Sequence, residues 1–190
     1  VLDRLEQREA FSSLSLRLRA ELLLNLRKPE EAAAAAEYAL GMDPGNAEAI
    51  ILLANARLRL NQADQALGLA QEACQIADKA HPKLRRNAYI QLGEAFRELQ
   101  RGDEEIKVCQ KLTTLDEGDL SSWLALGRAY WMNRQYRQAI LAIENGLSSL
   151  PGNLSLEWMR CMYTLLPLYE SPEEQNYMRR LYSSRLNTLE

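Results

Sequence analysis

Residues 120–153, LSSWLALGRAYWMNRQYRQAILAIENGLSSLPGN, decide the fold class of this chain. In the first half of the stretch, apolar and small residues recur at short intervals, at Trp123, Leu126, Gly127 and Tyr130. In the second half, intervals of four residues give Ala139, Ile143 and Leu147. Such spacings place side chains on one face of an α-helix, so the stretch predicts two helices that pack face to face. Pro151 is expected to end the second helix.

The pattern recurs along the chain with a period of 34 residues. A period of this length is typical of helix–turn–helix repeats. We expect four repeats, at residues 13–46, 47–80, 86–119 and 120–153. Small residues stand where paired helices must approach closely, as Ala54 and Ala66 do in the second repeat. The sequence therefore predicts an all-helical stack of repeats.

Three segments lie outside the repeats. Residues 81–85, which contain Pro82, form a linker between the second and third repeats. Either the preceding helix runs on to about Ala80, or the following helix starts early. Residues 1–12 are expected to be a helical segment of a partial earlier repeat. Residues 154–190 are expected to form capping helices, the first of which ends at Pro167.

The last helix has the strongest start signal in the chain. Ser171 is a candidate N-cap, Pro172 occupies the first helical position, and Glu174 follows three residues after the cap. We expect this helix to run to about Thr188. Its apolar stripe is expected to seal the end of the stack, and consists of Met178, Leu181, Tyr182, Leu186 and Leu189.

The spacing Trp-x-x-Leu-Gly-x-x-Tyr, followed by Ala139 and Pro151, resembles the signature of the tetratricopeptide repeat. The resemblance implies an all-α, right-handed superhelix, or α-solenoid, of helix–turn–helix repeats with helical end caps. It also implies that the first helix of each repeat lines a concave groove, in which a protein or peptide partner binds.

In the family's frame, the groove is lined by the second, fifth, sixth, ninth, twelfth and thirteenth residues of a repeat. The candidate partner-binding residues that this frame implies are Arg17, Asn25, Asn55, Arg59, Asn87, Gln91, Glu94, Arg97, Arg128 and Trp131. Arginine and asparagine suit hydrogen bonds to a peptide backbone or to acidic side chains, and Trp131 suits an aromatic anchor.

Two specialised versions of the family are not reproduced here. Co-chaperone repeats grip a C-terminal carboxylate with Lys and Asn, and the corresponding ninth and sixth places hold Glu21 and Leu52. Protein O-linked N-acetylglucosamine transferases carry a ladder of Asn at the sixth place. In this chain the sixth places hold Leu18, Leu52, Gln91 and Ala125.

The tail carries a second resemblance. Residues 166–174, LPLYESPEE, resemble the junction in bacterial proteins of the SPINDLY or O-linked N-acetylglucosamine transferase type, where repeats precede a glycosyltransferase domain. The match departs at Gln175, where an aliphatic residue is more usual. This resemblance implies that the chain is the substrate-recruiting region of a larger protein O-glycosyltransferase-like protein. The alternative is a stand-alone, non-enzymatic adaptor or assembly factor.

Composition argues against several other classes of partner. The 190 residues include 23 basic and 26 acidic side chains, a net charge of −3, so no overall positive field favours nucleic acid or an anionic membrane. No apolar run approaches the roughly 20 residues that span a bilayer, and no leader opens the sequence. Val1 in place of Met indicates a processed or excised chain. We expect a cytoplasmic protein, with a homodimer through the terminal helices left open.

Catalytic or metal-binding residues do not gather in the sequence. His81 is the single histidine, and the linker position favours a solvated side chain. Cys74, Cys109 and Cys161 are far apart, and each is expected to be buried in a helix interface. We therefore expect no metal, no cofactor and no enzymatic activity in this chain.

Overall fold

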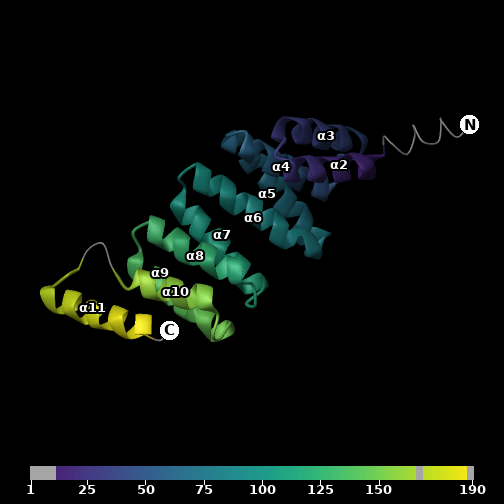
Figure 1. The fold of residues 1–190 in the computed structure, drawn as a ribbon. Coiled ribbons are helices and arrows are strands. Elements are labelled where there is room, and N and C mark those ends of the chain that lie inside the picture. Colours follow the sequence, from purple (N-terminus) through teal and green to yellow (C-terminus); the bar gives the residue numbers. More distant parts are fainter. Residues whose placement is uncertain (1–11, 166–168, 188–190) are drawn as a thin grey trace, which may run out of the picture. The chain divides into compact units, whose positions relative to one another are not determined.

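The computed structural model describes residues 12–165 and 169–187, and these residues form helices without a strand (Figure 1). The α-helices are α2 (Ser13–Asn25), α3 (Pro29–Met42), α4 (Ala47–Arg59), α5 (Ala63–Lys79), α6 (Arg85–Glu98), α7 (Gly102–Leu115), α8 (Leu120–Met132), α9 (Tyr136–Ser149), α10 (Leu154–Tyr163) and α11 (Pro172–Asn187). The predicted all-α fold class is confirmed. The helical segment predicted for residues 1–11 and the helix end predicted at Pro167 lie outside the described residues.

The chain divides into two compact units, and the division falls inside α7. The N-terminal unit is residues 1–108, and the C-terminal unit is residues 109–190. In the N-terminal unit, consecutive helices from α2 to α6 pack on one another, and α4 also contacts both α2 and α6. In the C-terminal unit, α9 packs on α8 and on α10, and α10 contacts α11. Each unit is thus built from helices that pack on their sequence neighbours.

Polar side chains begin four of the first helices. Ser12, Asn46, Asp119 and Asn153 each accept a hydrogen bond from the backbone N–H three residues further on, at 3.0–3.2 Å. These caps satisfy backbone donors that a helix start leaves free. α6 begins differently, because the 3₁₀ turn η1 (Pro82–Leu84) precedes it and its cap Leu84 makes no side-chain hydrogen bond.

The turn that ends α2, α4, α6 and α8 repeats in detail. Arg27, Asn61, Gln100 and Arg134 have positive φ, between 57 and 60°. The N–H of the following residue donates to the carbonyl five residues before it, for example from Lys28 to Leu23 at 2.9 Å. This bond defines the Schellman motif, which usually has glycine at the left-handed position. None of these four positions holds glycine, and the motif forms with Arg, Asn or Gln instead.

The linker between α5 and α6 follows the first of the two alternatives predicted. α5 runs to Lys79 and has 17 residues, whereas α3 has 14. Ala80 caps α5, and η1 then occupies most of the linker. The extra residues therefore lengthen the second helix of the pair and add a short turn.

Two glycines let helices of the C-terminal unit approach closely. A Cβ atom at Gly127 would lie 2.7 Å from Cδ1 of Ile143, and one at Gly146 would lie 2.9 Å from Cγ of Trp123. The indole of Trp123 is fixed, because its Nε1 donates to the carbonyl of Glu117 at 2.8 Å. Gly146 therefore occupies a place that has no room for a methyl group.

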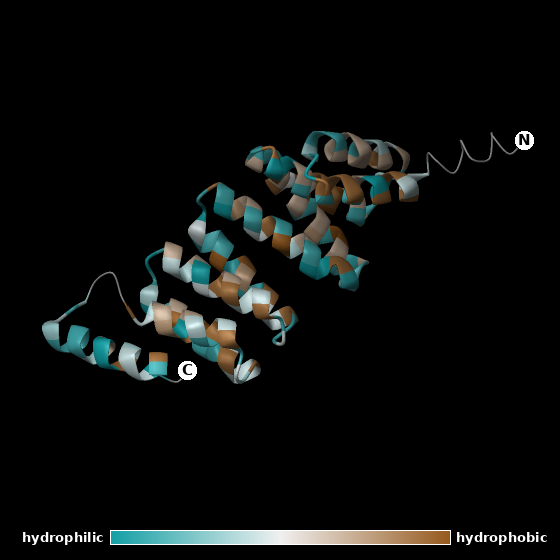
Figure 2. Ribbon diagram, viewed as in Figure 1, coloured by the Kyte–Doolittle hydropathy of each residue, from teal (hydrophilic) through white to brown (hydrophobic). Residues whose placement is uncertain are grey.

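The final helix is held by polar contacts. Arg185 of α11 donates to Thr164 Oγ1 at 2.8 Å and pairs with Glu144 of α9 at 2.7 Å. No described residue of α11 is buried, and Figure 2 shows the helix as mostly hydrophilic. The expected apolar seal is partial, because Met178, Leu181 and Tyr182 are half-buried whereas Leu186 is exposed. Arg185, whose side chain is only 14% exposed, adds a polar anchor. Leu189, the last member of the predicted stripe, lies outside the described residues.

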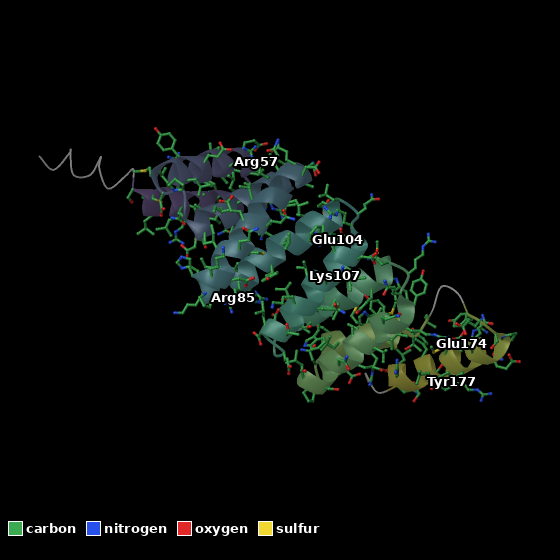
Figure 3. All side chains as sticks on the ribbon, turned by 180° about the vertical axis from the view of Figure 1, so that it is seen from behind. Arg57, Arg85, Glu104, Lys107, Glu174 and Tyr177 are labelled. Carbon is green, nitrogen blue, oxygen red and sulfur yellow. The ribbon has the colours of Figure 1, made fainter. Side chains whose placement is uncertain are left out.

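The start of α11 is tied to α9 by a second polar contact. Arg137 pairs with Glu170 at 2.9 Å and with Glu174 at 3.0 Å, and Figure 3 labels Glu174 near the beginning of α11. The N–H of Glu170 also donates to the Glu174 carboxylate. This hydrogen bond and the Arg137 charge hold the pKa of Glu174 below its usual value, although burial opposes them. The carboxylate therefore remains ionised under ordinary conditions.

Candidate functional site

The first helices α2, α4 and α6 carry eight of the predicted partner-binding residues. We call this set the N-terminal face, and it consists of Arg17, Asn25, Asn55, Arg59, Asn87, Gln91, Glu94 and Arg97. Asn25, Arg59 and Asn87 are exposed, whereas Gln91 is buried with 9% of its surface accessible. Gln91 is therefore not at the surface that a partner would touch.

Several arginines of the N-terminal unit are already neutralised by carboxylates. Arg17 of α2 pairs with Glu48 of α4. Arg97 pairs with Glu94 in the same helix and with Glu98 at 3.4 Å. Burial alone would lower the pKa of Arg97, but the neighbouring glutamates raise it above its usual value. These contacts leave Arg17 and Arg97 less free to bind an acidic partner.

Arg57, labelled in Figure 3, is likewise ion-paired. It pairs with Glu37 of α3 and donates to Gln62 at 2.8 Å. On α2, α4 and α6, Arg17, Arg57 and Arg97 thus pair with glutamates and Arg85 pairs with Asp78. Arg19 and Arg59 are exceptions, because no carboxylate of the described residues lies at ion-pair distance from them.

Arg59 is such an exception. Its Nε donates to Asn55 Oδ1 at 2.9 Å, and its guanidinium also donates to the carbonyl of Leu24 in α2. Within the described part of the chain, no carboxylate lies within ion-pair distance of Arg59. The side chain is therefore positioned by two neutral acceptors, and no described carboxylate compensates its positive charge.

A second arginine stands beside it. Arg27, Pro29 and Arg59 line an open pocket of 480 Å³, which we call the Arg27–Arg59 pocket. Arg27 has no acidic partner among the described residues either, and it lies at the left-handed turn after α2. Two arginines among the lining residues give this pocket a local positive charge, which suits a carboxylate or another anion. Sequence reasoning missed Arg27, because the turn position lies outside the groove frame.

The C-terminal unit presents a different surface. We call it the C-terminal face, and it consists of Arg128, Trp131 and Met132 of α8 with Trp158 and Met162 of α10. Met132, Trp158 and Met162 are exposed large apolar residues, with Met132 the most open at 72%. Arg128 is exposed and has no carboxylate within ion-pair distance in the described chain. This face therefore offers apolar contact area beside one free positive charge.

Trp131 packs against other aromatic rings of the C-terminal unit. Its ring stacks on Tyr163 at a centroid distance of 4.4 Å and meets the ring of Tyr136 at 5.0 Å. Burial raises the pKa of Tyr163, and the positive charge of Arg128 opposes that rise. The aromatic group consequently joins α8 to α10 as well as bordering the exposed surface.

Sequence reasoning missed Trp158 and Met162, although the repeat frame contained the signal. Counted from Leu154, they are the fifth and ninth residues of a further first helix. Both places belong to the groove positions of the frame used above. The predicted groove residues all belong to the four repeats, and none of them lies in α10.

Groups that could support catalysis do not converge in the described residues. No cluster of three or more His, Cys, Asp or Glu side chains suited to a metal ion occurs there. Cys74, Cys109 and Cys161 are buried, as predicted, and burial together with Asp78 raises the pKa of Cys74 to about 12. A thiol with a pKa this high is a poor nucleophile. His81 is exposed in the linker, also as predicted.

Residues 23–86 match the model of the tetratricopeptide repeat family. These residues therefore carry tetratricopeptide repeats. None of the curated proteins matches the sequence of this chain. Among its described helices, none is long and apolar enough to cross a membrane.

Solved structures share the tetratricopeptide repeat fold. MamA from Desulfovibrio magneticus RS-1 superposes with a TM-score of 0.71 at 12% identity, over 92% of this chain and 93% of that one. YrrB, described as a repeat protein with an unusual peptide-binding site, gives 0.70 at 14% identity, over 99% and 91%. The first repeat domain of Spaghetti (RPAP3), bound to the HSP90 peptide SRMEEVD, gives 0.59 at 20% identity, over 65% and 96%. These likenesses show the fold.

Proposed function

We propose that this chain is a scaffold that binds a polypeptide partner through its first helices, with carboxylates of the partner at the Arg27–Arg59 pocket. The observation that carries the proposal is a pair of arginines that line one open pocket of 480 Å³ and have no carboxylate of the described residues at ion-pair distance. Other arginines of the same unit, such as Arg17 and Arg97, pair with glutamates.

The physical basis is the charge-assisted hydrogen bond. A guanidinium donates two parallel N–H bonds to a carboxylate, and such bonds to charged groups contribute about 1.5–3 kcal/mol each. Arg59 is held by Asn55 and by the Leu24 carbonyl, so part of its entropy cost is met before binding. The neighbour solved with the acidic peptide SRMEEVD supports the proposal, because it shows that repeats of this fold accommodate such a partner.

The C-terminal face supports binding of a polypeptide rather than a small anion. Exposed tryptophan and methionine side chains are typical of binding surfaces, because they present large, adaptable apolar area. Trp158 and Met162 present such area on α10. A partner segment with large apolar side chains would bury this area, while Arg128 would receive an acidic residue.

The experiment compares two labelled peptides by fluorescence anisotropy. One is SRMEEVD and the other is SRMQQVN, both with an amidated C-terminus, so that they differ only in side-chain carboxylates. We expect the chain to bind the acidic peptide at least tenfold more tightly, which corresponds to about 1.4 kcal/mol. Arg59→Gln and Arg27→Gln should each remove most of this preference. Arg97→Gln is the matched control and should retain it, because Glu94 and Glu98 already occupy that guanidinium.

Equal affinity for the two peptides would contradict the proposal. Loss of the preference in Arg97→Gln with retention in Arg59→Gln would move the acid-binding site to α6. Circular dichroism of each variant checks that helicity is unchanged.

The tail resemblance supports a more specific role, as the substrate-recruiting region of a protein O-glycosyltransferase-like protein. Residues 166–174 carry that resemblance, and residues 166–168 lie outside the described part of the chain. The competing role is a stand-alone adaptor or assembly factor. Sequencing the reading frame beyond Glu190 separates them, since a nucleotide-sugar domain supports the first role and a stop codon removes it.

A further inference from the structure

The solvent side of α3 carries an exposed stripe of apolar and small residues. Tyr38 and Met42 are large side chains with 65% and 53% of their surface accessible. Together with Ala34, Glu37 and Gly41 they line an open pocket of 540 Å³. Four of these residues recur at helical intervals and share one side of α3. We call them the α3 stripe, and they are Ala34, Tyr38, Gly41 and Met42.

The other second helices show that the fold does not require an aromatic ring at this place. The residues at the position of Tyr38 in the later repeats are Glu72 in α5, Lys111 in α7 and Asn145 in α9. All three are polar and exposed. The Tyr38 hydroxyl also has no hydrogen-bond partner within the described chain. The exposed ring of α3 is therefore free to contact another molecule.

The second helices of the N-terminal unit are acidic. α3 and α5 carry six acidic residues and one basic residue, which are Glu30, Glu31, Glu37, Asp64, Glu72, Asp78 and Lys79. In the part of the chain that the structure describes, no cation lies at ion-pair distance from Glu30, Asp64 or Glu72. Leu69 of α5 packs against the apolar cluster to which α3 contributes, so the two acidic helices are neighbours.

The first helices of the same unit have the opposite charge. α2, α4 and α6 carry seven basic and four acidic residues. The N-terminal unit therefore has an excess of positive charge on its first helices and of negative charge on its second helices. A partner that suits the α3 stripe differs in charge from one that suits the Arg27–Arg59 pocket.

We propose that the α3 stripe binds a basic amphipathic helix of a partner protein. From Ala34 to Met42 the stripe extends over about 12 Å of α3, or two turns, which matches the apolar side of a short helix. Apolar side chains of the partner cover Tyr38 and Met42. A Cβ added at Gly41 would have no atom within 4 Å, so the partner backbone has room to approach there. Its lysines or arginines meet carboxylates such as Glu30.

Two labelled peptides that differ only in the sign of their charges test the partner chemistry by fluorescence anisotropy. They are AKLAKKLAKLAKKLA and AELAEELAELAEELA, both with blocked ends, and each places its leucines on one side of a helix. Both are titrated into the full chain with Arg27→Gln and Arg59→Gln, so that the first-helix pocket does not bind the glutamate peptide. We expect the lysine peptide to bind at least tenfold more tightly. Equal affinities, or no binding of the lysine peptide, would overturn the proposal.

Two substitutions in the otherwise native chain test the place of binding. Tyr38→Ser should weaken binding of the lysine peptide at least fivefold, because it removes the ring that the leucines cover. Leu141→Ser is the matched control, since Leu141 is 57% exposed on α9 at the position that Ala34 has in its repeat. Affinity in this control should stay within twofold of the wild type, and circular dichroism checks that both variants keep their helicity. Equal losses in the two variants would overturn the proposal in favour of unspecific apolar adhesion.

Hydrogen–deuterium exchange and sedimentation distinguish the other possible occupants. The lysine peptide should slow exchange in α3, while α4 and α6 exchange as in the free chain. Protection confined to the first helices would overturn the proposal. A dimer of the free chain that Tyr38→Ser dissociates would also overturn it, in favour of a second copy on this surface.

Discussion

The indole of Trp131 lies almost parallel to the ring of Tyr163, with 9° between the two planes and 4.4 Å between the ring centroids. Trp131 belongs to α8 and Tyr163 to α10, so the stacked pair joins two first helices of the C-terminal unit. Trp158, exposed on α10, has no such partner ring in the described structure. The two tryptophans therefore should respond differently to substitution.

Replacement of Trp131 by Leu should lower the free energy of unfolding by about 1–2 kcal/mol, because an aromatic stack contributes about 0.5–1.5 kcal/mol beyond buried area. Urea denaturation followed by circular dichroism measures the change. Trp158→Leu is the matched control, and it should stay within about 0.5 kcal/mol of the wild type. Equal losses in the two variants would contradict a structural role specific to Trp131.

Trp158 should matter for binding instead. Trp158→Ala should weaken capture of a polypeptide that uses the C-terminal face by about 2 kcal/mol, because tryptophan is a common binding anchor. Titration of the variant with such a polypeptide, by calorimetry, measures the loss. Tyr177→Ala removes an exposed aromatic from α11 and serves as the control, with no expected effect. An undiminished affinity in Trp158→Ala would exclude this face from the contact.

Replacing Gly146 or Gly41 by alanine should change the stability of the fold in opposite directions. Gly146→Ala should destabilise the fold by about 1–3 kcal/mol, because its Cβ would meet Trp123 at 2.9 Å. Gly41→Ala in α3 has nothing within 4 Å of the new Cβ, so the higher helix propensity of alanine should stabilise by up to about 1 kcal/mol. Thermal unfolding of both variants provides the comparison. A stabilising Gly146→Ala would mean that the close approach to Trp123 is absent.

The left-handed turn positions predict stabilisation by glycine. Gln100→Gly and Arg134→Gly should each raise the free energy of unfolding by about 1 kcal/mol, because a side chain at positive φ costs roughly 1–2 kcal/mol. Asn61→Gly should raise the free energy of unfolding by less, since asparagine tolerates the left-handed conformation. The urea concentrations at the unfolding midpoints of the three variants rank their stabilities. A decrease in stability for Gln100→Gly would contradict the turn geometry.

The attachment of α11 should depend on pH. The pKa of Glu174 is lowered in the folded chain, so its stabilising contribution is complete above the unfolded value of about 4.3 and is lost as the pH falls through the lower folded value. Hydrogen exchange of the first turns of α11 should therefore accelerate, beyond the intrinsic pH effect, in strongly acidic solution. Glu174→Gln should cause the acceleration already at pH 6, whereas its neighbour Glu173→Gln should not. Protection that is independent of both changes would show that Arg137 does not hold this helix.

The sequence predicted the helices better than the binding residues. The apolar spacing in each repeat depends only on local helix geometry, so the paired helices and the buried cysteines follow from it. Whether an arginine is ion-paired depends on side chains from other helices. Arg17 of α2, for example, pairs with Glu48 of α4. The repeat positions predict the same role for Arg17 and Arg59. In the structure, Arg17 is ion-paired with Glu48, whereas no described carboxylate pairs with Arg59.

Other features carried too weak a sequence signal. The turns at Gln100 and Arg134 lack the glycine that marks a left-handed position, so they were not predicted. The anchoring of α11 by Arg185 was missed because the pattern of the helix emphasised its apolar residues. At the turns, a polar residue occupies the left-handed position where glycine is usual. At the end of the chain, a polar residue anchors a helix for which apolar packing is usual.

Hydrogen–deuterium exchange with and without bound acidic peptide tests the central claim most directly, namely that the first helices contact the partner. Peptide SRMEEVD at saturating concentration should slow exchange in the last turns of α2 and α4, next to the Arg27–Arg59 pocket. α3 and α5 should exchange as in the free chain, and Arg59→Gln should abolish the protection. Protection confined to α3 and α5, or unchanged by Arg59→Gln, would contradict the account.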